Sequence, residues 1–202
     1  MKKLLLLIPF VALIIGCGGG GEADYYPLAA GNEWNFSLTV NVTTPDTTLT
    51  FTGTQVQTIT EETTLDDNTP VFEQMTIMTT NIDTLTTMVD TSIVYEEKTA
   101  DYIFEYESKA DTVPDTALAL PLEEGKTWNV NSETKIVVIG QEDVTVPAGS
   151  YTDCWKAAVI TGSDTGYAYV APDIGFVKMD MIETNADTTN EIHIELEDVN
   201  LQ

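Results

Sequence analysis

Apolar and polar residues alternate along much of the chain, and this period of two constrains the fold more than any other feature. Its clearest case is the segment 35–43, in which one face collects Phe36, Leu38, Val40 and Val42. Segment 49–60 shows a similar alternation, with Leu49, Phe51 and then Val56 as its apolar residues. In segment 191–198 the alternating apolar residues are Ile192, Ile194 and Leu196. Such alternation is typical of strands with one buried and one solvated face, which favours an antiparallel sheet.

Turn-forming residues interrupt the alternation at short intervals, in segments 43–46, 65–70, 110–115, 147–150, 161–166 and 171–175. Between these turns the chain is rich in strand formers. Threonine alone accounts for 32 of 202 residues, and β-branched and aromatic side chains fit a pleated, half-buried surface. We therefore predict a mainly β fold with about ten to twelve antiparallel strands.

The first residues, 1–16, have the features of an export signal. Lys2 and Lys3 precede an apolar run over residues 4–15, which Pro9 interrupts. A run of this length is too short to cross a hydrocarbon core of about 30 Å. The segment is therefore expected to be a signal peptide that is removed, and not a membrane-spanning helix.

The residues directly before Cys17 are small or apolar, which matches the lipobox of bacterial lipoproteins. We predict cleavage between Gly16 and Cys17, lipid attachment with palmitate at Cys17, and a flexible Gly-rich tether over residues 17–24. The alternative is an ordinary secretory signal with an incidental cysteine. Lipidation would leave Cys154 as the one thiol, expected in the core, and would exclude an intramolecular disulfide. No aspartate stands directly after Cys17, which favours the outer membrane within the cell envelope.

Charge narrows the possible partners. The full chain has a formal net charge of −25, and loss of residues 1–16 removes two lysines and no acid, which gives −27 for the mature protein. Such a surface repels nucleic acid and anionic lipid headgroups, so neither is expected as a partner. Attachment to the membrane would have to come from the acyl chains.

One motif, Pro-Leu-x-x-Gly-x-x-Trp-Asn, occurs at residues 27–35 and again at 121–129. Its proline favours an extended entry, its glycine a turn, and its tryptophan the start of a strand. Residues 25–202 are expected to form a single β domain. The recurrence also suggests an internal duplication, with possible repeat units at 25–115 and 119–202.

Four ordered strings carry a family resemblance: "YYPLAAGNEWNFS", "PLEEGKTW", "VTVPAGSYTDCWKA" and "YAYVAPDIGFVK". Together they resemble a group of bacterial lipoproteins with PLxxGxxW, VPAGTF and YAPGVGLVK motifs, among them TapB-like and other domain-of-unknown-function proteins. Asp173 and Phe176 replace the usual Gly and Leu, and Ser150-Tyr151 replaces Thr-Phe. The resemblance implies a curved antiparallel sheet or half-barrel, similar in fold to LolA, and a location in the cell envelope. It implies no known activity.

Catalytic patterns are weak, and we expect a protein that is not an enzyme. Asp164-Thr165-Gly166 matches an aspartic-protease loop, but no second copy exists and a hairpin turn explains it better. The one histidine, His193, belongs to no nucleophile motif. We predict no cofactor and no metal, although two acidic sets could hold a divalent ion: Glu191, His193, Glu195 and Glu197 on one strand, and the loop acids Asp66, Asp67, Asp111 and Asp115.

The concave face of a curved sheet is the remaining place for a site, because it either fills itself with side chains or leaves room for a ligand. The candidate lining residues for an apolar ligand, such as a lipid or acyl chain, are Trp34, Phe36, Trp128, Trp155 and Tyr169. The leading hypothesis is therefore a lipid-anchored envelope protein that binds an apolar ligand or an envelope protein partner, or supports outer-membrane assembly. The alternative is a structural or adhesive module that uses its acidic, Thr-rich face.

Overall fold

A computed structural model describes residues 23–82, 86–185 and 187–202 of the protein. The predicted signal peptide, its cleavage site, Cys17 and most of the tether lie outside the described residues. The described part of the chain forms one antiparallel sheet of twelve strands and contains no helix. The prediction of a mainly β fold with a curved antiparallel sheet is confirmed. None of the described residues forms a helix that is long and apolar enough to span a membrane.

The strands follow one another along the chain with short connections. They are β1 (Glu33–Thr43), β2 (Thr48–Thr64), β3 (Pro70–Asn81), β4 (Thr87–Lys98), β5 (Tyr102–Tyr106), β6 (Asp115–Ala119), β7 (Thr127–Asn129), β8 (Thr134–Val146), β9 (Gly149–Thr161), β10 (Asp164–Ala171), β11 (Gly175–Asn185) and β12 (Thr188–Asn200).

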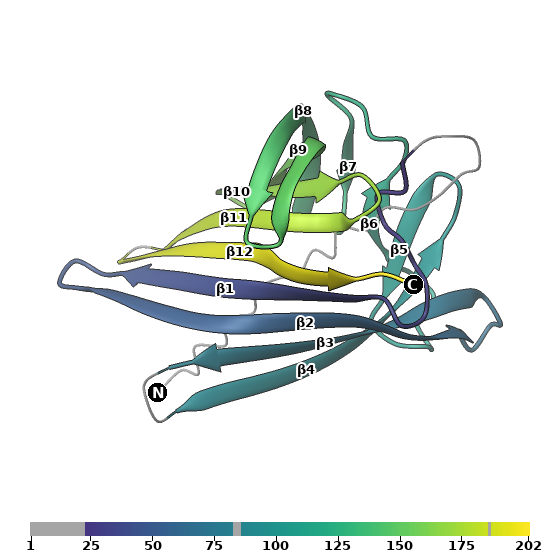
Figure 1. The fold of residues 1–202 in the computed structure, drawn as a ribbon, viewed down its shortest axis with the longest axis horizontal. Coiled ribbons are helices and arrows are strands. Elements are labelled where there is room, and N and C mark those ends of the chain that lie inside the picture. Colours follow the sequence, from purple (N-terminus) through teal and green to yellow (C-terminus); the bar gives the residue numbers. More distant parts are fainter. Residues whose placement is uncertain (1–22, 83–85, 186) are drawn as a thin grey trace.

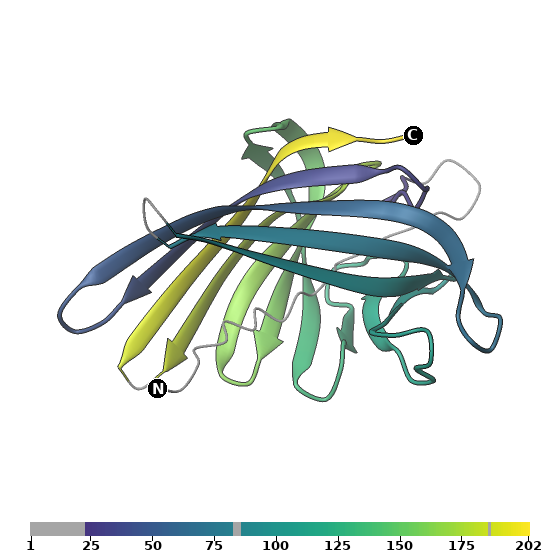
Figure 2. The ribbon, with the colours of Figure 1, turned by 90° about the horizontal axis from the view of Figure 1, so that it is seen from below.

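The sheet consists of two meanders of six strands that share one seam. Strands β1 to β6 lie in sequence order outward from β1, strands β12 to β7 lie in reverse order outward from β12, and β1 pairs with β12 at the seam. The sheet curls so strongly that its two margins approach each other (Figures 1 and 2). The backbone N–H of Thr116 in β6 donates to the carbonyl of Val130, just after β7, at 2.9 Å. The result is a nearly closed half-barrel.

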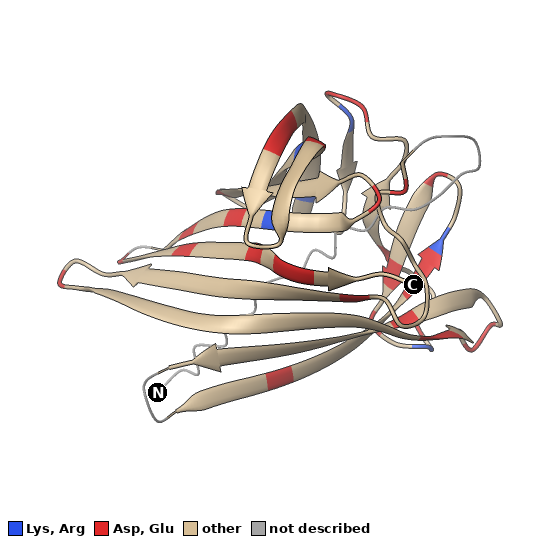
Figure 3. Cartoon of the chain, in the orientation of Figure 1, with Lys and Arg blue, Asp and Glu red and all other residues tan. Residues whose placement is uncertain are grey.

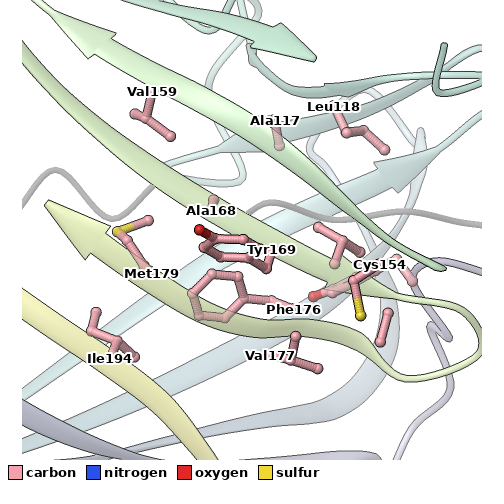
Figure 4. Packing of buried hydrophobic residues seen from close by; sticks show 14 of the residues in the cluster. Ala117, Leu118, Cys154, Val159, Ala168, Tyr169, Phe176, Val177, Met179 and Ile194 are labelled. Carbon is pink, nitrogen blue, oxygen red and sulfur yellow. The ribbon is translucent and has the colours of Figure 1, made fainter. Parts of the chain in front are cut away.

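The alternating pattern decides which face of the sheet is the inner one. In β1 the side chains of Trp34, Phe36, Leu38 and Val40 are buried, and their neighbours are not. Across the seam, Leu196, Ile194 and Ile192 stand opposite Phe36, Leu38 and Val40. Opposite residues of an antiparallel pair point to the same face, so these residues form one apolar layer. The apolar core continues over β8 to β11, where Ala168, Met179 and Phe176 pack together (Figure 4).

One detail of the alternation differs from the prediction. The sequence suggested that Val56 would join Leu49 and Phe51 on the buried face. In the structure the phase of β2 does not change, so Val56 is only partly buried, while Gln55 and Gln57 are buried. Leu49 was also predicted to be buried but is 52% exposed, and Phe51 is only partly buried, because the start of β2 extends beyond the core. Segment 49–60 therefore turns polar side chains toward the interior.

The two copies of the Pro-Leu-x-x-Gly-x-x-Trp-Asn motif form the same turn. Gly31 and Gly125 both have positive φ, +94° and +82°, a region that glycine enters without a steric penalty. The N–H of Gly31 donates to the carbonyl of Ile59, and the N–H of Ile59 donates to the carbonyl of Asn32. In the second copy the N–H of Gly125 donates to the carbonyl of Val138, and the N–H of Val138 donates to the carbonyl of Lys126. The copies thus share local structure and open the two meanders. That the meanders arose by duplication stays a prediction, and β6 spans the boundary expected between the repeat units.

Candidate functional site

A pocket lies at one end of the half-barrel, beside the β2–β3 hairpin. Its volume is about 450 Å³, within the range of roughly 300–1,000 Å³ that is typical of ligand sites. We call it the end pocket. It is lined by the last residues of β2, the first of β3 and the last of β4: Glu62, Thr63, Thr64, Pro70, Val71, Phe72 and Lys98.

The interior next to the end pocket is polar. Phe72, which lines the pocket, stands opposite Glu96 in the β3–β4 ladder, and Glu96 stands opposite Glu105 in the β4–β5 ladder. Further along the same face lie buried amide and hydroxyl side chains from β2 and β3. We call this set the polar row, and its members are Gln55, Gln57, Gln74, Thr76, Glu96 and Glu105.

A segment that precedes β1, residues 24–28, crosses the end of the half-barrel beside the pocket. We call it the N-terminal strap. Asp24 and Asp173, in the β10–β11 turn, are joined by two hydrogen bonds of 2.7 Å, from Asp24 N–H to the Asp173 carboxylate and from Asp173 N–H to the Asp24 carbonyl. On the other side Lys98 forms a 3.4 Å ion pair with Asp24 and donates to the carbonyl of Tyr26 at 3.2 Å. The strap therefore ties the two meanders together at this end.

Tyr26 is the strap residue whose side chain contacts the polar row. Its ring stacks on Trp34, with centroids 5.7 Å apart, and its hydroxyl lies 2.6 Å from Gln74 Oε1 and 2.8 Å from Glu96 Oε2. A hydroxyl has one hydrogen to donate. If Tyr26 donates to Gln74, Glu96 must be protonated and donate to Tyr26.

Burial favours that protonation. Glu96 is fully buried, and desolvation, followed by the nearby Glu105 carboxyl, holds its pKa well above the ordinary value. Burial also raises the pKa of Glu105 to about 8; its side chain is partly exposed as a whole, but Oε2 is buried. Desolvation raises the pKa of Tyr26 as well, and the Glu96 carboxyl adds to the effect. The polar row is thus neutral near pH 7, in keeping with the cost of burying unpaired charge.

Several atoms of the polar row have no hydrogen-bond partner among the described residues: both amide atoms of Gln55, Nε2 of Gln74, Oε1 of Glu96 and Oε2 of Glu105. Buried polar groups in folded proteins nearly always have a partner, either protein or water. These atoms offer both donors and acceptors. The arrangement can therefore hold a hydrogen-bonding group of a ligand, or ordered water, behind the end pocket.

The aromatic residues that the sequence suggested as ligand contacts are all packed in or against the core. Trp34 donates from Nε1 to the carbonyl of Ile174 at 2.7 Å, and Phe36 packs on Phe176 with ring centroids 5.3 Å apart. Trp128 and Tyr169 are buried, and Trp155 is partly buried against the same cluster. The structure brings these residues into one core, but none of the five lines the end pocket.

The other sequence candidates lie on the outer face or in turns. His193 Nδ1 is 2.8 Å from the Asp180 carboxylate, and Glu195 pairs with Lys178 at 3.3 Å. Asp164 begins β10 after a hairpin turn and accepts the N–H of Thr184. Among the described residues, no three His, Cys, Asp or Glu side chains gather closely enough to hold a metal ion.

Cys154 is fully buried, as predicted, and desolvation raises the pKa of its thiol to about 11. A buried thiol with a raised pKa is a poor nucleophile.

The acids Asp67 and Asp111 accept backbone N–H groups within their own loops. These contacts give both residues a structural role.

The sequence-based reasoning missed the polar row, although one signal was available. Gln55 and Gln57 continue the phase of Phe51 and precede Ile59 in that phase, so an unbroken period of two places both amides inside. Glu96 and Glu105 left no comparable signal, because their burial depends on strands that pair only in the folded chain.

The fold and the end pocket together describe an antiparallel half-barrel with an open pocket of about 450 Å³ at one end. A protein from Bacteroides fragilis, inferred to be exported and described as having a YmcC-like fold, is similar at a TM-score of 0.49 and 15% identity, covering 88% of this chain and 99% of that one. A protein from Parabacteroides distasonis, inferred to be a lipoprotein, gives 0.48 and 14%, covering 90% and 100%. No family model and no curated protein matches the sequence.

Proposed function

We propose that this protein is a lipid-anchored, non-enzymatic binding protein of the bacterial cell envelope, and that the end pocket holds an amphipathic ligand. The observation that carries the proposal is a 450 Å³ pocket whose wall residue Phe72 stands opposite Glu96, a buried carboxyl whose Oε1 has no partner among the described residues. Phe72, Pro70 and Val71 offer an apolar surface, and the polar row offers hydrogen bonds behind it.

Two features restrict the class of ligand. The polar row contains two carboxyl groups and no lysine, and the chain as a whole is strongly acidic. The pocket residue Lys98 is already paired with Asp24. A neutral or cationic polar group is therefore favoured over an anion. The site is also close in sequence to the predicted anchor. Asp24, which pairs with the pocket residue Lys98, follows Cys17 by seven positions, and a chain of that length spans at most about 25 Å. A lipid-derived ligand would therefore have a short path from the membrane.

The sharpest test uses the neutral fluorescent probe N-phenyl-1-naphthylamine and the mature chain, residues 17–202, with Cys17→Ser to prevent acylation. We expect Phe72→Ala to weaken binding of the probe at least about fivefold, because the aromatic wall of the pocket is lost; fivefold corresponds to about 1 kcal/mol. Val113→Ala is the matched control, since Val113 is an apolar residue that is 84% exposed and does not line the pocket.

Circular dichroism of both variants establishes that each is folded before binding is compared. Equal affinity of parent, Phe72→Ala and Val113→Ala would show that the probe does not enter the end pocket and would refute the assignment of the site.

A further inference from the structure

The strand β4 has a long edge that no described strand covers. On one side β4 pairs with β3 from Thr87 to Glu96 without interruption. On the other side it pairs with β5 only from Tyr95 to Lys98, because β5 has just five residues. Within the described residues, the stretch 87–94 is therefore a free edge, about 27 Å long at the rise of a β-strand. It lies at the margin of the sheet (Figures 1 and 2).

This edge lacks the features that normally keep an edge strand from pairing with another chain. Native edges are usually short, bulged, or blocked by lysine or proline, yet "TMVDTSIV" contains neither residue and a single acid, Asp90. The β3–β4 register has no bulge. Met88, Val89 and Ile93 are 59%, 65% and 43% exposed. Figure 3 shows how few charged residues lie on this part of the molecule.

The edge of β8 provides an internal comparison. Beyond its short pairing with β7, β8 is interrupted by two register shifts in its ladder with β9. The same stretch contains Gly140, Glu142 and Asp143. The edge of β8 is thus irregular and charged, whereas the edge of β4 is regular and nearly uncharged.

We propose that the β4 edge pairs antiparallel with the β4 edge of a second copy, in a register centred on Thr91. A two-fold axis perpendicular to the sheet keeps inner face beside inner face, so residue numbers in each pair sum to 182 in this register. Thr91 then faces its own copy, Val89 faces Ile93, and Met88 faces Val94. Every exposed apolar side chain gains an apolar neighbour, which is the pairing that stabilises a sheet.

The position of Asp90 also supports a two-fold axis at Thr91. With the axis at Thr91, Asp90 faces Ser92 of the second copy. An axis one residue earlier would place the two Asp90 carboxylates directly opposite each other, which is destabilising. An axis at Ser92 would place Asp90 opposite Val94. Centring on Thr91 also confines the contact to residues 88–94, clear of the stretch that β5 already covers.

The orientation of the backbone fits this register, and pairing exchanges one existing contact, that of Thr91 N–H, for a bond between the two copies. Thr91 N–H donates to the carboxylate of its neighbour Asp90 at 3.0 Å, so it points away from β3 and toward the free edge. Residues two positions away share that orientation in a strand. Val89, Thr91 and Ile93 therefore present their N–H and C=O groups outward, and the proposed register pairs these three residues with one another.

The test uses the mature chain with Cys17→Ser and disulfide trapping. Paired residues of an antiparallel ladder have Cα atoms about 5.5 Å apart, a separation that a disulfide bridges. We expect Thr91→Cys to cross-link to its own copy under mild oxidation. Val89→Cys alone should not, but should cross-link when mixed with Ile93→Cys. The natural Cys154 is fully buried and does not compete.

Sedimentation velocity of the parent tests the association itself. Because both copies are strongly acidic, the dimer should strengthen as NaCl rises from about 0.05 M to about 0.5 M, which screens the repulsion. Thr91→Pro removes the outward N–H and should give a folded monomer, while Thr52→Pro, in the interior of the sheet, should unfold. A parent that stays monomeric at high salt, or Val89→Cys that cross-links as fast as Thr91→Cys, would overturn the proposal. The probe-binding result at the end pocket is independent of either outcome.

Discussion

At the scale of single residues, the buried carboxyl groups of the polar row set the pH dependence of stability. Glu96 and Glu105 have raised pKa values in the folded protein, so folding retains protons that the unfolded chain has released above its ordinary pKa of about 4.5. Since the unfolded state binds fewer protons in this range, the free energy of unfolding falls as pH rises. For Glu105 this loss of stability continues until the pH has risen through the folded-state pKa of about 8.

We therefore predict that Glu105→Gln stabilises the protein at pH 9, by roughly 1–3 kcal/mol, and changes stability little at pH 5, where the native carboxyl is already neutral. Urea denaturation of both proteins at the two pH values measures the difference. Glu197→Gln, on the exposed outer face, controls for the loss of one charge. An equal effect of Glu105→Gln at pH 5 and pH 9 would contradict the assignment of a neutral carboxyl.

The residue scale also shows where sequence reasoning stops. Trp34, Phe36 and Leu38 could be assigned to the interior because they are apolar and in phase. Gln55 is in phase with Phe51 of its own strand, but an amide is usually exposed, so the sequence favours Val56 over Gln55 as the buried residue. The burial of Gln55 depends on how the strands pack in the folded chain, and a local pattern carries no information about such contacts.

At the scale of elements, the N-terminal strap is the feature whose role the sequence did not indicate. Tyr26 is the one strap residue that reaches the polar row, and its hydroxyl contacts both Gln74 and Glu96. We predict that Tyr26→Phe lowers the free energy of unfolding by about 1–3 kcal/mol, because two buried partners lose a hydrogen bond. Tyr25→Phe, at the neighbouring position without a described side-chain hydrogen bond, should cost far less. Equal costs in thermal or urea denaturation would show that the hydroxyl contacts are not formed.

The strands themselves were largely predictable and their pairing was not. Alternation and turn residues located most strands, including β1 and β12, and the count of twelve falls within the predicted range. The seam between β1 and β12 joins residues about 160 positions apart, such as Phe36 and Leu196. Neither strand contains a signal that selects the other, since both carry the same alternation of apolar and polar residues.

At the scale of the whole molecule, one end of the half-barrel concentrates the features that point to function. The end pocket, the polar row and the strap meet there, and the strap leads back toward the predicted lipid anchor. The open β4 edge, residues 87–94, lies on a strand whose last residue, Lys98, lines the end pocket, but the edge is the stretch away from that residue. Ligand binding and association with a second copy would therefore use different surfaces of the same molecule.

The central claim is that the end pocket holds an amphipathic ligand, and native mass spectrometry of protein purified from the producing bacterium tests it most directly. The account predicts that the mature Cys17→Ser chain retains a small lipid-derived molecule, neutral or cationic, and that Phe72→Ala, purified in parallel and folded, loses it. Val113→Ala should keep it. Parent protein that carries no bound molecule, and whose melting temperature does not change when extracted envelope lipids are added, would contradict the claim.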